Sequence, residues 1–285
     1  MDPLDLVGLK PLMARTSGRS SVVVGLIDGR VAPDHPAFAG RPVRALRPTA
    51  GARACRGADV CCVHGTAVAG IIAGSDGVCP RCTLLSRPLF ADHPTDGGPA
   101  TCLSGVRTGE LAEAITETVD AGAHVLNLSM AQPAPSGVRD HALETALDHA
   151  ADRGVIVVVA AGNQGRVGSS VLTDHPWVIP VTAYDRAGHP MPQSNRGMSI
   201  GRHGVGAPGD RIPGLGLDGH ALVLSGTSAA APFVTGTVAL LRSAFPKAGP
   251  AAVRYAVTHG PGRRRSVTPP LLDAWAACTA LRDLS

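Results

Sequence analysis

The chain is poor in aromatic residues, since Phe, Tyr and Trp together make up 3% of its 285 residues. A hydrophobic core must therefore be built from Ala, Val, Leu and Ile. Charged residues are also sparse, at 17%, whereas 44% of the residues are hydrophobic. This balance excludes an intrinsically disordered chain and predicts a globular protein with a large core.

Long apolar segments are lacking as well. No run of about 18 apolar residues occurs, so no membrane span is expected. The N-terminus, MDPLDLVGLKPLMARTSGRS, has no positively charged segment followed by an apolar one, as a secretory signal would have. The expected location is therefore cytoplasmic.

Positive charge is present but not concentrated. The net charge is +4 with histidine neutral, and this mild, dispersed excess argues against nucleic acid as a partner. The one basic run, Arg263-Arg264-Arg265, is interpreted as a solvated loop, with an acidic contact as the alternative.

The seven cysteines are an odd number, and without a secretion signal reduced thiols are the default. Cys79 and Cys82 have CxxC spacing, so a local disulfide and a structural zinc site stay open as alternatives. No metal and no cofactor are predicted. The cysteines are Cys55, Cys61, Cys62, Cys79, Cys82, Cys102 and Cys278.

Apolar runs and helical periodicity alternate along the chain, which predicts an α/β fold with a parallel sheet and helices on both faces. No repeat or linker divides the chain, so residues 1–285 are expected to form one domain, with 1–20 as an N-terminal extension and Gly204–Gly219 as loops. The expected strands are Ser21–Ile27, Thr83–Phe90, His124–Leu128, Val155–Ala160 and Trp177–Ala183. The expected helices are His64–Ala73 (beginning at the histidine), Thr108–Asp120, Val138–Arg153, Thr227–Phe245 and Pro250–Thr258.

Four polar residues stand at the ends of these elements. Asp28 ends the first strand, His64 lies in an apolar helix, Asn163 follows the central strand, and Ser228 begins the long helix in GTSAAAP. Asp, His and Ser in this order form a catalytic triad known on one α/β fold. Ser228 is the candidate nucleophile, His64 the base, Asp28 its orienting acid, and Asn163 an amide donor to an oxyanion.

These residues stand in motifs that resemble those of the subtilisin-like serine proteases: LIDG, HGTAVAG, AAGN, APG and GTSAAAP. The resemblance implies the subtilisin-like three-layer fold, with a central mostly parallel sheet. It implies a peptide substrate, a second substrate-pairing strand near residues 99–104, and the triad and oxyanion roles given above. The further substrate-binding residues that it implies are Ser129, Met130, Ala131, Ala161, Gly162 and Thr227.

Several positions depart from the wider family. Gly29 follows the catalytic Asp where Ser or Thr is usual, Ala67 replaces a second His, and Ala229 replaces Met or Phe. Ala131-Gln132 stands where Gly-Gly is usual. The calcium-binding insertion of secreted subtilisins and a prodomain both look absent.

A narrower resemblance is to the cyanobactin maturation proteases, carried by the opening GLKPLMARTSGRSSVVVGLIDGRVAPDHPAF and by the stretch Ser194–Gly197. It implies an enzyme that removes a leader or follower from a ribosomally made precursor peptide. The alternatives are a macrocyclising transamidase, which would carry a helical insertion not seen here, a general intracellular protease, and an inactive peptide-binding scaffold. His35 is expected to pack in a loop, and the oligomeric state stays open.

Overall fold

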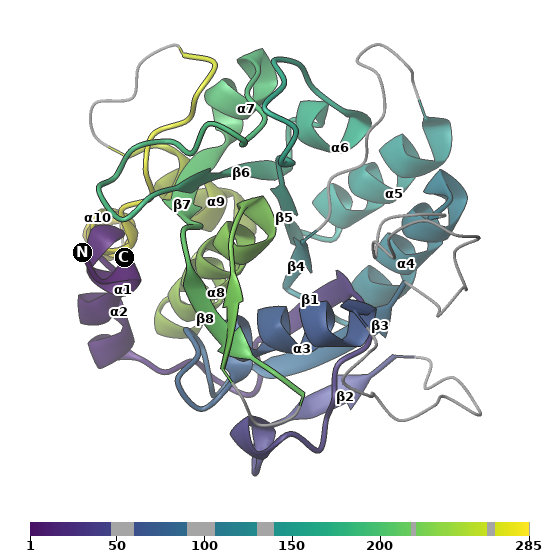
Figure 1. Ribbon diagram of the computed structural model, residues 1–285, viewed down its shortest axis with the longest axis vertical. Coiled ribbons are helices and arrows are strands. Elements are labelled where there is room, and N and C mark those ends of the chain that lie inside the picture. Colours follow the sequence, from purple (N-terminus) through teal and green to yellow (C-terminus); the bar gives the residue numbers. More distant parts are fainter. Residues whose placement is uncertain (47–59, 90–105, 130–139, 218–220, 261–265, 285) are drawn as a thin grey trace.

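The computed structural model describes residues 1–46, 60–89, 106–129, 140–217, 221–260 and 266–284 (Figure 1). In this part of the chain, a parallel sheet has the strand order β2-β3-β1-β4-β5-β6-β7, and β8 and β9 form a separate antiparallel pair. This confirms the predicted α/β class. The strands are β1 (Val23–Asp28), β2 (Val43–Ala45), β3 (Thr83–Pro88), β4 (Val125–Leu128), β5 (Ile156–Ala160), β6 (Ile179–Tyr184), β7 (Val205–Pro208), β8 (Ile212–Leu215) and β9 (Ala221–Leu224).

Helices cover both faces of the sheet. On one face lie α3 and α8, with α2, α9 and α10 outside them, and on the other lie α4, α5 and α6 (Figure 1). The helices are α1 (Pro3–Leu6), α2 (Leu9–Arg15), α3 (Val60–Ala73), α4 (Thr108–Asp120), α5 (His141–Asp152), α6 (Val171–Asp174), α7 (Met198–His203), α8 (Thr227–Ala244), α9 (Pro250–Thr258) and α10 (Ala274–Asp283), with a short 3₁₀ helix at Pro36–Phe38.

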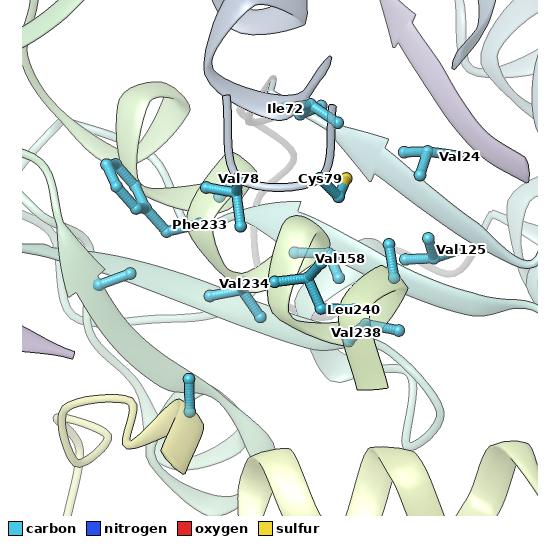
Figure 2. Close-up of a cluster of buried hydrophobic side chains, with 14 of the residues drawn as sticks. Val24, Ile72, Val78, Cys79, Val125, Val158, Phe233, Val234, Val238 and Leu240 are labelled. Atoms are coloured by element: carbon cyan, nitrogen blue, oxygen red, sulfur yellow. The ribbon is translucent and has the colours of Figure 1, made fainter. Parts of the chain in front are cut away.

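The central strands are apolar throughout because successive side chains enter different cores. In β5, Ile156 and Val158 belong to the core under α3 and α8, whereas Val157 and Val159 belong to the core under α4 and α5. Figure 2 shows Val158 of the first core near Val234 of α8. Helix α8 is buried along almost its whole length, as the run of small residues after Ser228 allows.

Helix α3 begins earlier than predicted. It already includes Val60, so His64 lies inside the helix and not at its start. Cys and Val are weak helix formers, and this hid the helical segment before His64. Packing of the helix against the end of β1 overrides that weak propensity.

The interpretation of Gly204–Gly219 as loops alone is also wrong, because this stretch contains β7 and β8. The residues Val205–Pro208 include glycine and proline, which are rare inside strands. Their pairing with β6 at the end of the sheet outweighs that preference.

The N-terminal residues form part of the globular fold. Helix α2 packs on α10 and α8, and Leu9 and Leu12 are fully buried there. Helices α1, α2 and α10 were not predicted. Each is short, so the apolar periodicity that indicates a helix extends over fewer than three turns.

We expect Leu12→Ala to lower the free energy of unfolding by about 2–5 kcal/mol, because it leaves a cavity under α2. Urea denaturation followed by circular dichroism would measure the change. The matched control is Ala14→Ser, an exposed position on the same helix, which should stay within about 0.5 kcal/mol of the unmodified chain. Equal stability of the two variants would show that α2 does not support the fold.

Candidate active site

The predicted site residues gather at the carboxyl edge of the sheet. Strand β1 is central, with β3 on one side and β4 on the other, so the chain changes its winding direction there. Open α/β sheets bind ligands outside the carboxyl ends of strands at such a point. Asp28 ends β1, Ser129 follows β4, and Ala161–Asn163 follow β5.

Asp28 and His64 form a hydrogen-bonded pair, with 2.7 Å between Asp28 Oδ1 and His64 Nδ1. The Gly29 N–H donates to the same carboxylate oxygen over 2.7 Å. Asp28 is 1% exposed, whereas the His64 side chain is 23% exposed. When His64 Nδ1–H donates to Asp28, Nε2 of the neutral ring is left as a proton acceptor on the open side.

Two glycines let α3 approach the end of β1 closely. A Cβ atom at position 29 would lie 1.9 Å from the Cys61 carbonyl oxygen, and one at position 65 would lie 2.5 Å from the Gly29 carbonyl oxygen. A Ser or Thr after the catalytic Asp, usual in the wider family, therefore does not fit here. Among the described residues, Asp28 Oδ2 is buried without a hydrogen-bond partner.

The pKa of His64 is raised. Burial by itself lowers it, because the imidazolium loses hydration, but the negative charge of Asp28, the hydrogen bond to Asp28 and the charge of Cys61 together outweigh burial. The protonated form of His64 is thus stabilised. This suits a general base, because the base carries the proton during the reaction.

Ser228 lies in the first turn of α8, as predicted. Gly226 caps the helix with φ of +107°, which favours glycine, and a Cβ atom there would lie 2.8 Å from Asn163 Oδ1. Of the first N–H groups of this helix, that of Thr227 donates to the Asn163 side chain and that of Ala229 to the Gly226 carbonyl, and the helix dipole favours negative charge at this end.

Thr227 holds the side chain of Asn163 in place. Asn163 Oδ1 accepts from the Thr227 N–H at 2.9 Å and from the Thr227 hydroxyl at 3.2 Å. The same hydroxyl accepts from the Gly162 N–H at 3.2 Å. With its oxygen occupied, Asn163 has Nδ2 available as a donor beside the start of α8. Thr227, predicted to bind substrate, thus contacts the oxyanion candidate directly.

Asn195 anchors the loop that carries Asn163, a role that the motif Ser194–Gly197 did not reveal. Its Nδ2 donates to the Ala161 carbonyl at 3.0 Å, and its Oδ1 accepts from the N–H groups of Gln164 and Arg166 at 3.1 Å each. The short segment Asn195–Gly197 gives no signal in the sequence for contacts about 30 residues away.

His64 and Ser228 come from helices that pack against each other, α3 and α8. Among the described residues no hydrogen bond joins His64 Nε2 to Ser228 Oγ. Catalytic hydrogen bonds are often long before substrate binds, so this geometry is compatible with a base and a nucleophile. Ser129 Oγ donates to the carbonyl oxygen of Ser228 at 3.1 Å.

Other predicted residues lie elsewhere or outside the described part. His35 accepts from the Ala37 N–H and contacts the Gly216 carbonyl oxygen at 3.2 Å, so it packs in a loop as expected. Some residues that the sequence analysis singled out lie outside the described part of the structure: Met130, Ala131, 99–104, 263–265, Cys55 and Cys102.

The cysteines decide one open alternative and correct one expectation. Cys79 and Cys82 are free thiols, so they form no local disulfide, and the hydrogen bond to Cys82 together with burial raises the pKa of Cys79. Cys62 is disulfide-bonded, so reduced thiols are not general in this chain. Pairing depends on which sulfur atoms the fold brings within bonding distance, and spacing along the chain does not show that.

Within the described ranges, no group of three or more His, Cys, Asp or Glu residues is placed to hold a metal ion. No helix in the same ranges is both long and apolar enough to cross a membrane.

A parallel sheet with a buried Asp–His pair, a serine at a helix start and an amide beside it is the arrangement of a triad-type serine hydrolase. The chain belongs to the subtilase family, peptidase S8, whose family model matches residues 19–266. This confirms the family expected from the motifs.

Relatives and solved structures agree with this assignment. The chain is 32% identical to mycosin-3 of Mycobacterium tuberculosis, over 77% of this chain and 60% of the relative, so it spans less than two thirds of that protein. The prenylagaramide maturation protease PagA is 30% identical with a TM-score of 0.82, over 96% of this chain and 98% of PagA. The patellamide maturation protease PatA is 32% identical with a TM-score of 0.78, over 93% of this chain and 98% of the PatA chain.

We expect Gly29→Ser to weaken the contact between α3 and β1, because its Cβ would overlap the Cys61 carbonyl. The clash is with backbone, so the helix must move away and separate His64 from Asp28. The melting temperature should fall by several degrees, as about 1–3 kcal/mol of overpacking implies. Calorimetry measures it, and Gly249→Ser is the control, because a Cβ there meets nothing within 4 Å and its φ of −63° suits any residue. A Gly29→Ser variant as stable as the unmodified chain would contradict the close approach.

We expect the His64 ring to titrate above the ordinary value of about 6.5, and Asp28→Asn to lower that midpoint. Asp28 supplies both the charge and the hydrogen bond that raise the pKa, whereas the opposing effect of burial remains in the variant. Because the pKa is raised in the folded state, protonation of His64 stabilises the fold, and this contribution is lost as pH rises through the raised pKa. NMR titration of the His64 ring resonances in the unmodified chain and in Asp28→Asn tests this. An unchanged midpoint would contradict the coupling.

Proposed function

We propose that this chain is a serine endopeptidase that cleaves ribosomally made precursor peptides, with Asp28, His64 and Ser228 as its triad. The observation that carries the proposal is the hydrogen bond from His64 to buried Asp28. His64 lies on α3, which packs against α8, and Ser228 lies in the first turn of α8. Membership of the subtilase family supports the same reaction.

In this mechanism Ser228 Oγ attacks the carbonyl carbon of the scissile peptide bond while His64 Nε2 takes the hydroxyl proton. Asp28 holds the ring orientation and stabilises the imidazolium. His64 then gives the proton to the leaving amine, and an acyl-enzyme remains on Ser228. A water molecule, deprotonated by His64, releases the second product.

The oxyanion formed in each step would be bound by Asn163 Nδ2 and by the N–H of Ser228. Thr227 orients the Asn163 amide, and Asn195 holds the loop on which it sits. A donor of this kind contributes roughly 3–4 kcal/mol to transition-state stabilisation. The donors are held in place before substrate arrives, so little reorganisation is needed.

We infer that the chain segments after β4 and β5 line the pocket for the residue before the scissile bond. These strands are neighbours in the sheet, so Ser129 on one side and Ala161 and Gly162 on the other end at the same edge.

A precursor peptide is the substrate class that the similarities support. PagA and PatA are both named as maturation proteases, and each matches this chain over nearly its full length. We propose that the chain removes the leader or follower of such a precursor in the cytoplasm. The chain spans only part of the length of its curated relatives.

We expect Ser228→Ala to abolish cleavage of a precursor-peptide library while leaving the circular dichroism spectrum unchanged, since the side chain supplies the nucleophile. A fluorophosphonate probe should label Ser228 of the unmodified chain, detected by mass spectrometry of tryptic peptides. The matched control is Ser225→Ala, a serine on the exposed surface just before the helix, which should retain labelling and turnover.

Persistent turnover in Ser228→Ala would contradict the triad assignment. The product masses also decide between the two outcomes of the acyl-enzyme. Fragments that have gained water indicate hydrolysis, whereas a cyclic product without added water would show the transamidase alternative. A labelled enzyme that cuts unrelated unfolded proteins as well as the library would indicate a general protease.

A further inference from the structure

The long helix α8 contains a proline, Pro232, just after its first turn. In an α-helix the N–H of each residue donates to the carbonyl four residues earlier. Proline has no N–H, so the carbonyl of Ser228 is deprived of its donor within the helix. The residue that the proposed function makes the nucleophile therefore begins a helix with an incomplete hydrogen-bond ladder.

Ser129 supplies a donor to that carbonyl. Its Oγ donates to the Ser228 carbonyl oxygen at 3.1 Å, across 99 positions of sequence. Ser129 is 5% exposed, so the bond is shielded from water. A buried carbonyl that has lost its partner costs free energy, and this hydroxyl removes that cost.

The hydroxyl of Ser129 is itself held by a buried chain of hydrogen bonds. Asn127 Nδ2 donates to Ser129 Oγ at 2.7 Å, and Thr235 Oγ1 donates to Asn127 Oδ1 at 2.8 Å. Asn127 and Thr235 are fully buried. Thr235 lies about two turns after Ser228 on the same helix, so the chain of bonds leaves α8, passes through the end of β4 and returns to α8.

We propose that Ser129 is a positioning residue that takes the place of the helix hydrogen bond missing at Pro232 and so fixes the backbone of Ser228 for attack. This inference rests on the proposed function, because it assigns the effect to the nucleophile. Rigid support of a reacting group matters because displacements of about 1 Å can cost two orders of magnitude in rate. Ser129 acts here through Ser228, while its backbone stays available to the substrate.

The test is a double-mutant cycle between Ser129→Ala and Pro232→Ala. Ser129→Ala should lower kcat by about three- to tenfold, the loss expected for one neutral hydrogen bond, with KM nearly unchanged. Pro232→Ala in the same chain restores an N–H four residues after Ser228, so the double variant should recover most of the lost kcat. The rate of fluorophosphonate labelling at Ser228 should follow the same pattern.

The matched control is Ser243→Ala, which removes another buried hydroxyl of α8 that donates to a helix carbonyl, that of Ala239 at 2.8 Å. It should affect stability but leave kcat and the labelling rate unchanged. If Ser129→Ala does not fold, Thr235→Val tests the same chain of bonds one step further from Ser228, with a smaller loss of kcat expected.

Three results would overturn the proposal: an unchanged kcat in Ser129→Ala, a change confined to KM or to the preferred substrate residue, or no recovery with Pro232→Ala. The last two would show that the hydroxyl serves the substrate pocket or another purpose. Failure of the proposed function itself is distinguishable, since the unmodified chain would then show no labelling at Ser228.

Discussion

Helix α3 lies against the end of β1 so closely that backbone meets backbone, and the rest of the site depends on this contact. Gly29 and Gly65 have no room for a Cβ atom, since the facing carbonyl oxygens occupy that space. The contact sets the 2.7 Å separation of Asp28 and His64, and with it the tautomer and the raised pKa of the histidine. A bulkier residue after Asp28 would add a donor for its carboxylate only by moving the helix that carries the base.

The opposite part of the site depends on α8, which is buried along almost its whole length, its first residue Thr227 included. Helix α8 packs on one face of the sheet through a core of Val, Leu and Ala residues. Its small residues allow it to lie close to the strands. The buried helix thus holds its first turn, with Ser228, in place at the carboxyl edge of the sheet. Polar residues around it are satisfied by one another: Asn163 by Thr227, and the Ser228 carbonyl by Ser129.

Sequence patterns identified the central strands because these are buried on both faces and read as continuous apolar runs; Val155–Ala160 against the observed Ile156–Ala160 is an example. Helices Thr108–Asp120 and Pro250–Thr258 were predicted with the observed bounds, since clear stop and start residues mark their ends. The start of α3 was missed because weak helix formers precede His64. Strand β7 was missed because its stability comes from pairing with β6 and not from its own composition.

The sequence by itself determined the family, the fold class and which residue types could form the triad, because motifs and apolar periodicity are local properties of the chain. Only the tertiary structure decided how these residues are supported. Asn195 holds a loop about 30 residues away, Cys62 is disulfide-bonded while Cys79 is not, and Ser129 bonds to a carbonyl 99 positions distant. Such contacts depend on which segments the fold brings together. Local patterns in the sequence do not show these long-range pairings.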